Sequence, residues 1–410
     1  MSAAGSGPGA SRARTAAIAL AVTLAIQVFT ALAGTATAVL APEIGRDLGL
    51  APKLVGVFVG LVYAGSMGAS LVSGGFIQRH GAIRVSQACV LLCAAGVAWV
   101  AGTPAMPGAV VPALAAAAIV IGLGYGPITP ASSHVLARTA PPSRMALTFS
   151  IKQTGVPAGA ALAGAALPAV ALAIGWQAAF ALVAALGVVI ALVAQAARPL
   201  LDTGRMPARP LSVAGVFAPL GLVLRTPALV ELALTAFVYA SLQVCLTSFL
   251  VVYLTETLAF SLVAAGFALT VANIGGIVGR IVWGAVADAH LAPRALLGLL
   301  GVAAGACAGA TAAFGASWPT EAILLVCAVF GSTAIGWNGV QLSEVARHSP
   351  AGQAGAVTGA CGFITFGGVV FGPPAFALVS ALTGGYRTGF AVFGALSVAC
   401  GLWLLVKHRQ

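Results

Sequence analysis

The sequence has 410 residues, of which 60% are hydrophobic and only 7% are charged, and its mean hydropathy is +1.07. Water-soluble proteins carry roughly 25% charged residues, so this chain has too few charges to cover the surface of two or three soluble domains. Its 52 glycines suit helices that pack closely within lipid. The composition therefore predicts a membrane protein.

Twelve continuous apolar runs follow one another along the chain, and each is long enough for a membrane-spanning helix of about 20 residues. They cover residues 15–40, 54–77, 85–103, 111–137, 146–170, 177–197, 227–254, 263–287, 295–316, 321–346, 355–379 and 387–406. Because the runs are continuous and do not alternate between apolar and polar residues, they favour helices over a transmembrane β-barrel. The predicted fold is an all-α membrane protein with twelve transmembrane helices.

The distribution of Lys and Arg predicts the orientation of these helices. The chain has 19 basic against 8 acidic residues, a formal net charge of +11, which in a soluble protein would suggest a nucleic-acid partner. With the N-terminus inside, 14 of the 19 bases fall in cytoplasmic segments, three fall in outer segments and two fall within spans. Cytoplasmic segments are enriched in Lys and Arg. Both termini are therefore expected in the cytoplasm, and the charge requires no nucleic acid.

Short segments flank the spans at the two ends. Residues 1–14 are polar and are predicted to be a disordered cytoplasmic N-terminus, and residues 407–410 are predicted to be a cytoplasmic tail. The first span is followed by eleven more, which indicates that it is retained rather than cleaved as a signal peptide. All seven cysteines fall within predicted spans, so they are expected to pack as small apolar residues and not to form disulfides or bind metal.

The chain is predicted to contain one internal duplication. The Pro- and Arg-rich stretch 198–226 is interpreted as a cytoplasmic linker between two six-helix halves, residues 15–197 and 227–406. Related halves should match at an offset of about 210 residues. The matching pairs are Gly74 with Gly284, His80 with His290, Arg84 with Arg294 and, at an offset of 209, Arg138 with Arg347. Agreement at separate places supports the duplication.

Twelve spans, a central linker and this repeat resemble the major facilitator superfamily of secondary transporters, in its bacterial type. Its best-known motif is a Gly, an Asp four residues later and then basic residues, in the loops after spans two and eight. The second copy fits through Gly284, Asp288 and Arg294, whereas the first copy has Gln78 in place of Asp. The resemblance implies two pseudo-symmetric bundles and a latch between them at these loops. The implied gating residues are Gln78, Arg79, Arg84, Asp288 and Arg294.

Two basic residues lie inside predicted spans, where an ionisable side chain is costly and indicates a functional site. They are Lys152 in span five and Arg280 in span eight, each roughly 7–9 Å to the cytoplasmic side of the span centre at about 1.5 Å per residue. The family fold implies that these spans meet between the halves, where an anion would relieve the repulsion between the two cations. An Arg in span eight also resembles the monocarboxylate and oxalate branches. As alternatives, Lys152 snorkels toward the headgroups and Arg280 bonds carbonyl or carboxylate groups structurally.

No carboxylate is expected near the membrane midplane. Glu231 lies only a few residues into span seven, and Glu344 lies near the inner end of span ten. Together with His134 near the end of span four, they are the candidates for gating or proton coupling, with a structural role as the alternative for each.

Other polar or aromatic side chains within the spans are candidates for lining a substrate site, since Gly- or Pro-interrupted spans mark binding regions in transporters. They are Gln27, Tyr125, Gln153, Tyr239, Gln243, Asn273, Trp337 and Asn338. The interruptions GLGYGPITPASS in span four and IGWNGVQ in span ten occupy matching positions. Any one of these side chains would alternatively serve as an interhelical hydrogen bond.

The sequence predicts a secondary transporter of a small organic anion, resembling a monocarboxylate, that works by alternating access with coupling to an ion or a proton. It is expected to be a monomer in the bacterial inner membrane. No nucleotide loop, metal-ligand cluster or nucleophile–base pair is found, so no enzyme activity, metal or cofactor is expected. The alternatives are an exporter of drugs or other hydrophobic compounds and, more remotely, a membrane receptor or scaffold that does not transport.

Overall fold

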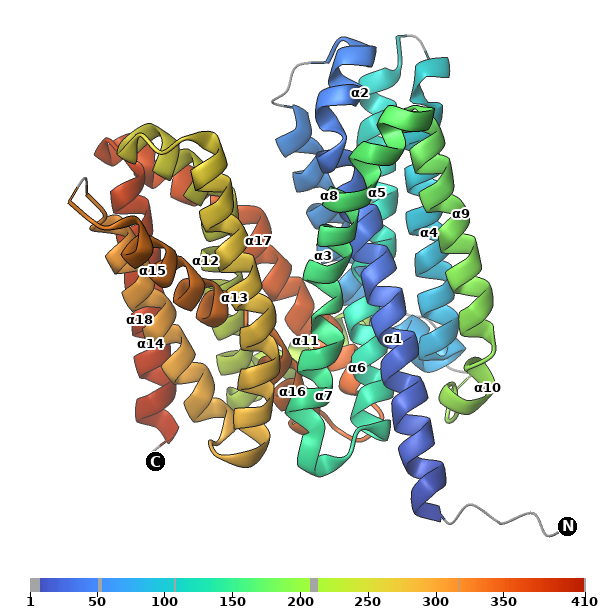
Figure 1. Cartoon of the computed structure of the whole chain (residues 1–410). Coiled ribbons are helices and arrows are strands. Elements are labelled where there is room, and N and C mark those ends of the chain that lie inside the picture. Colours follow the sequence, from blue (N-terminus) through green and yellow to red (C-terminus); the bar gives the residue numbers. More distant parts are fainter. Residues whose placement is uncertain (1–7, 51–53, 107, 207–212, 316, 409–410) are drawn as a thin grey trace, which may run out of the picture.

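The computed structural model describes residues 8–50, 54–106, 108–206, 213–315 and 317–408. Twelve helices in this part of the chain are long and apolar enough to cross a membrane, and the described residues contain no strand. The prediction of an all-α protein with twelve transmembrane helices in two bundles is confirmed (Figure 1).

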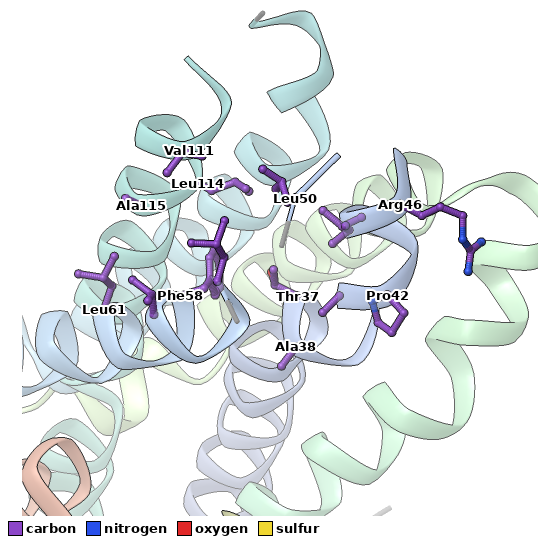
Figure 2. Close-up of a pocket in the computed structure, with 15 residues that line it drawn as sticks. Thr37, Ala38, Pro42, Arg46, Leu50, Phe58, Leu61, Val111, Leu114 and Ala115 are labelled. Carbon is purple, nitrogen blue, oxygen red and sulfur yellow. The ribbon is translucent and has the colours of Figure 1, made fainter. Parts of the chain in front are cut away.

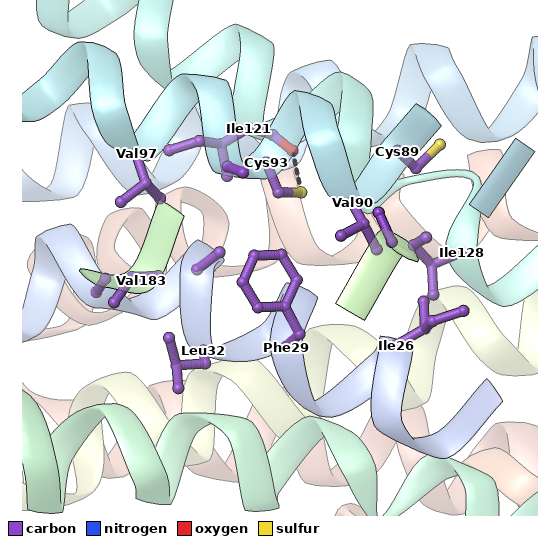
Figure 3. Close-up of a cluster of buried hydrophobic side chains, with 14 of the residues drawn as sticks. Ile26, Phe29, Leu32, Cys89, Val90, Cys93, Val97, Ile121, Ile128 and Val183 are labelled. Carbon is purple, nitrogen blue, oxygen red and sulfur yellow. Dashed lines mark hydrogen bonds between the residues drawn. The ribbon is translucent and has the colours of Figure 1, made fainter. Parts of the chain in front are cut away.

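The first six spans form one bundle. Its helices are α1 (Pro8–Val39), α2 (Ala41–Leu48), α3 (Leu54–His80), α4 (Ala82–Gly102), α5 (Val110–Tyr125), α6 (Ile128–Thr139), α7 (Met145–Gln153), α8 (Gly155–Ile174) and α9 (Trp176–Gln195). Its core packs apolar side chains of α1, α4, α5 and α9 around the ring of Phe29 (Figure 3). Gly187 of α9 lets that ring approach the helix backbone, because any side chain there would overlap it.

The last six spans form the second bundle. Its helices are α12 (Pro227–Leu258), α13 (Leu262–Ala289), α14 (Pro293–Ala312), α15 (Thr320–Ala334), α16 (Asn338–Arg347), α17 (Ala354–Thr383) and α18 (Tyr386–His408). Two clusters of buried side chains form its core, and the aromatic rings of Phe249, Phe376 and Phe390 meet in one of them.

Three spans are built from two helices each. Span four divides into α5 and α6 at Gly126 and Pro127, and span ten divides into α15 and α16 around Trp337. Both breaks fall within the interruptions that the sequence indicates. Span five also divides, after Gln153, into α7 and α8. Helix ends inside a membrane leave backbone groups that need partners, so these breaks face the interior of the protein.

The segments outside the bundles are more ordered than the sequence predicts. The segment 1–14, predicted to be disordered, is helical from Pro8 onward as part of α1, and residues 1–7 lie outside the described residues. Within the predicted linker 198–226, α10 (Arg198–Leu201) and α11 (Val213–Arg225) form. Helix α11 contains Pro219 and two glycines and packs against α3, α12 and α17, so tertiary packing rather than local helix propensity stabilises it.

The two bundles touch mainly near one end of the molecule. Both chain termini lie at this end, here called the terminal end, and the bundles diverge toward the opposite end, where α2 lies (Figure 1). The contacts join α7 to α13 and α16, and α17 to α3 and α6. The structure is therefore closed at the terminal end.

Two glycines that match in the repeat make close approaches between the bundles. A Cβ atom on Gly74 of α3 would lie 2.5 Å from the Cβ of Ala356 on α17, and a Cβ on Gly284 of α13 would lie 2.6 Å from the Oγ of Ser150 on α7. Real Cβ atoms do not come so close. Glycine therefore occurs at the same position of both halves, at Gly74 and Gly284, where each bundle contacts the other.

Replacing Gly74 with Val should separate the bundles at the terminal end, because overpacking of a tight contact costs roughly 1–3 kcal/mol. Pulsed EPR between spin labels at Ser143 and His290, two exposed positions on opposite bundles, would show a longer distance than in the parent protein. Gly68→Val on the same helix is the control, since a Cβ there meets nothing within 4 Å. Equal distance distributions in both variants would contradict the role assigned to Gly74.

Candidate functional site

A cavity of about 140 Å³ lies between the bundles, beside the breaks in spans four, five and ten. Helices α3, α5, α6, α7 and α8 line it from one side, and α12, α13, α16 and α17 line it from the other. Among the described residues, Arg280 is the one charged side chain in the lining, which contains no Asp, Glu or His. The cavity is small, mostly apolar and positively charged.

Arg280 joins the two bundles at this cavity. Its side chain is only 2% exposed. Its Nε donates to the main-chain oxygen of Ile335, at the break in span ten, over 3.1 Å, and its Nη1 donates to the main-chain oxygen of Gln153, at the break in span five. These bonds are the carbonyl contacts expected of a structural arginine. They use two of the five N–H donors of a guanidinium, and no further acceptor is found among the described residues.

Lys152 lies directly behind the cavity wall. Its side chain is 1% exposed, and its Nζ donates to Oε1 of Gln27 over 2.6 Å and to Oε1 of Gln153 over 2.9 Å. The side chain therefore turns inward and does not snorkel to the membrane surface. No ion pair with Lys152 or Arg280 occurs in the described part of the chain.

Gln153 connects the two bases. Its side-chain oxygen accepts from Lys152 and its main-chain oxygen accepts from Arg280, and the residue also lines the cavity. Both amide oxygens that hold Lys152, those of Gln27 and Gln153, come from the same bundle. The structure thus brings together four residues that the sequence indicates as candidates.

The second bundle supplies a polar patch to the same cavity. Asn338 Nδ2 donates to Gln243 Oε1 over 3.1 Å, and both residues line the cavity together with Trp337. Tyr239 does not line it: its ring packs edge-on against Trp337, and its hydroxyl donates to the main-chain oxygen of Leu297 over 2.9 Å. It supports the wall from behind.

Asn273 also lies outside the lining. Its amide donates to the main-chain oxygen of Leu269 in its own helix over 3.0 Å.

Three aromatic rings, carried by α3, α5 and α17, line another part of the cavity. Tyr63, Tyr125 and Phe366 have centroids 6.2–6.4 Å apart. Of these, sequence reasoning indicated only Tyr125. The other two lie on α3 and α17, which are unbroken helices, and the sequence gives no sign that their side chains face the cavity.

At the terminal end, Asp288 fixes one bundle to the other. Its carboxylate, 6% exposed, accepts from the main-chain N–H groups of Ala146 and Leu147 over 3.0 and 2.8 Å, which caps the N-terminus of α7. Arg347 lies 3.5 Å from Asp288 and 3.3 Å from Glu344. A carboxylate at a helix N-terminus satisfies free N–H groups and favours the helix dipole. Asp288 therefore acts across the interface between the bundles.

The matching position in the first bundle works differently. Gln78 is buried, and no hydrogen bond from its side chain is found among the described residues, while α17 begins without a side-chain cap. Arg138, which matches Arg347 in the repeat, donates instead to the main-chain and hydroxyl oxygens of Thr203 in the linker. The latch expected at Gln78 is therefore absent from this contact.

The linker supplies an acid to the first bundle instead. Asp202 accepts from the main-chain N–H groups of Ile83 and Arg84 over 2.7 and 3.1 Å, and Arg198 lies 3.6 Å away. Burial raises the pKa of the Asp202 carboxyl, and the two N–H groups oppose this rise. Gly81 permits the contact, since its φ of 94° and its close approach to Asp202 both suit glycine.

The remaining gating candidates lie at the terminal end, and two of them pair with each other. Arg294 of α14 forms an ion pair with Glu231 of α12 inside the second bundle. His134 lies beside Gln78 in a separate cavity of about 320 Å³ bounded by the linker. The side chain of Arg79 is partly exposed and that of Arg84 is exposed at the surface. The main-chain N–H of Arg84 donates to Asp202.

A cavity larger than the central one lies elsewhere. It measures about 530 Å³ and lies near α2 at the opposite end, between α1, α2, α3 and α5 of the first bundle. Its lining is apolar apart from Thr37 and Arg46 (Figure 2). Arg46 pairs with Glu43 at the surface over 2.9 Å. This cavity touches neither Lys152 nor Arg280, so the smaller central cavity is the candidate substrate site.

The sequence model of the Major Facilitator Superfamily matches residues 23–373. The chain belongs to the Major Facilitator Superfamily. No curated protein matches it at a significant level. The family assignment agrees with the duplicated fold, the central cavity and the cap by Asp288.

Solved structures of the superfamily share this fold at low sequence identity. A variant of the E. coli fucose:proton symporter FucP is 17% identical, with a TM-score of 0.72 over 97% of this chain and 100% of that one. A bacterial homologue of the iron transporter ferroportin in an outward-facing state is 17% identical, with a TM-score of 0.70 over 95% and 98%. The proton:xylose symporter XylE is 15% identical, with a TM-score of 0.66 over 94% and 95%.

Replacing Asp288 with Asn should open the terminal end, because the amide offers only one acceptor to two N–H groups and carries no charge for the helix dipole. Loss of such a cap costs roughly 0.5–2 kcal/mol, enough to change the ratio of conformations several-fold. The same EPR label pair at Ser143 and His290 measures it.

Asp202→Asn is the matched control for this substitution, since Asp202 also caps a helix but within one bundle. It should lower thermal stability and leave the label distance unchanged. A longer distance in the Asp202 variant alone would assign the latch to the linker.

Proposed function

We propose that the protein is a secondary transporter that carries a small organic anion, resembling a monocarboxylate, by alternating access. The observation that carries this proposal is the central cavity, whose single charged lining group is Arg280, with Lys152 directly behind it and no carboxylate among the described residues to neutralise either base. Leaving a buried charge without a partner costs several kcal/mol, and an anionic substrate removes that cost. Arg also suits carboxylate groups, which it binds through two parallel N–H donors.

The size and chemistry of the cavity support a small substrate with one apolar face. A volume of about 140 Å³ is below the roughly 300–1,000 Å³ of sites for drug-sized ligands. The rings of Tyr63, Tyr125 and Phe366 offer an apolar surface, while Gln153, Gln243 and Asn338 offer amide groups. An elongated hydrophobic drug does not fit this site.

The protein is proposed to lie in a bacterial inner membrane as a monomer, with halves 15–197 and 227–406 joined by the linker 198–226. Most Lys and Arg residues fall in the loops of the terminal end, which the positive-inside rule places in the cytoplasm. The closed terminal end then corresponds to an outward-facing state. A solved structure of FucP and that of the ferroportin homologue are in outward-facing states.

Coupling to protons belongs to the same proposal. FucP is a fucose:proton symporter and XylE a proton:xylose symporter, and this similarity of fold supports a proton as the coupling ion. The candidates predicted for coupling, Glu231, Glu344 and His134, lie toward the terminal end and outside the central cavity. None of them reaches the proposed substrate site in this conformation.

The alternative function, export of hydrophobic compounds, has one observation in its favour, the apolar cavity of about 530 Å³. That cavity is confined to one bundle, whereas alternating access acts on a site between two bundles. The anion site therefore carries the stronger argument.

Replacing Arg280 with Gln should weaken anion binding roughly 30-fold or more, since the loss of a buried charged partner costs on the order of 2–5 kcal/mol. Thermal shift of the purified protein with acetate, lactate, pyruvate and benzoate measures it, because a ligand at 100 times its Kd stabilises by about 2.7 kcal/mol.

Arg46→Gln, an exposed arginine outside the central cavity, is the control and should bind the carboxylates normally. Equal stabilisation of the Arg280 variant by a carboxylate would overturn the anion proposal. Stabilisation only by hydrophobic cations or neutral drugs would favour the exporter.

A further inference from the structure

We propose that Lys152 is the proton-binding group of the transport cycle, and that it holds its proton while an anion occupies the central cavity. The inference rests on the proposed function and deepens it by naming the coupling residue. The described lining of the cavity offers no carboxylate and no imidazole. The proton carrier must therefore be sought among other groups that contact the cavity wall.

The two bases differ in what they can do when buried together. Arginine keeps its proton in proteins, whereas lysine readily changes its protonation state when it is taken out of water. Both converge on Gln153, Lys152 through the side-chain oxygen and Arg280 through the main-chain oxygen. The lysine is therefore the member of the pair that can exchange a proton as the charge of the site changes.

The hydrogen bonds of Lys152 suit both of its protonation states. An ammonium group has three N–H donors and a neutral amine has two. The structure supplies two acceptors, the amide oxygens of Gln27 and Gln153. Loss of one proton from Nζ therefore leaves both bonds intact, and the lone pair on nitrogen takes the proton up again. The third N–H is the exchangeable one.

The charged and titratable groups on the helices around α7 are already engaged or distant. On α13, Asp288 lies eight residues beyond Arg280, about 12 Å along the helix, and binds the start of α7. On α16, Glu344 pairs with Arg347.

Further groups lie on the other neighbouring helices. On α6, His134 and Arg138 line the cavity beside the linker. Arg144 precedes α7, and Arg12 and Arg14 lie near the exposed start of α1. Within the central cavity, the phenol groups of Tyr63 and Tyr125 complete the set. Among the described residues, no carboxylate is available to take over the role of Lys152.

The resulting cycle is electrically balanced. In the empty site, Arg280 carries the single positive charge and Lys152 is the neutral amine. Entry of one anion allows Nζ to bind one proton, so one anion and one proton move together. Release of the anion to the other side returns the lysine to the amine, and the proton leaves with it.

Calorimetric titration of the purified wild-type protein in two buffers of different ionisation enthalpy tests this directly, with acetate, lactate, pyruvate and benzoate as the probes. At about pH 8 the protein should take up about one proton for each anion bound, and affinity should fall about tenfold per pH unit above this. Lys152→Arg should bind the anion without proton uptake and without this pH dependence. Lys152→Met should bind more weakly and also take up no proton.

Lys407→Arg, near the end of α18, is the control and should behave as wild type. Proton uptake of the wild-type size in Lys152→Arg would overturn the assignment, and so would anion binding by the wild type with no proton uptake. Anion binding by the wild type without proton uptake would refute the role of Lys152 but not the proposal that the protein carries an anion. Because this outcome is measured on the wild type, it tests the role of Lys152 even where a variant fails to fold. Failure of all four carboxylates to bind the wild type would instead refute the proposed function itself.

Discussion

The central constraint on this structure is the burial of two basic side chains, Lys152 and Arg280, between two bundles whose described residues bring no carboxylate to them. The surrounding features can be understood from it. The breaks in spans five and ten expose the main-chain oxygens of Gln153 and Ile335, which satisfy part of the guanidinium. Two amide oxygens hold the lysine. These neutral acceptors satisfy N–H donors of both bases but supply no negative charge, and this is what makes the cavity receptive to an anion.

The duplicated fold closes its terminal end with two unequal contacts. In the second bundle, Asp288 crosses to the other bundle and caps α7. In the first bundle, Gln78 provides no such cap, and the acid nearest to this region, Asp202, comes from the linker and binds α4 within its own bundle. The close glycine contacts at Gly74 and Gly284 remain symmetric. Packing is therefore shared by the two sides of the interface, whereas the electrostatic latch acts on one side.

Much of the candidate site could be predicted from residue types alone, because a charge or an amide within an apolar span is conspicuous. Lys152, Arg280, Gln153, Gln243 and Asn338 were found in this way. Residue type does not predict whether a side chain in a span points toward the cavity or away from it. Tyr239 and Asn273 bond to nearby main-chain oxygens outside the cavity lining, whereas Tyr63 and Phe366 line the cavity from the unbroken helices α3 and α17.

By itself, the sequence determined the number of spans, the duplication and the family, because apolar length, charge distribution and repeat spacing are properties of the chain in order. It also indicated which residues would be costly to bury. The tertiary structure alone decided which of them meet. Whether a basic side chain reaches the membrane surface or a partner depends on neighbours more than a hundred residues away, as with Lys152 and Gln27 or Arg280 and Gln153. Periodicity along one helix carries no information about such contacts, since the packing of twelve helices sets them.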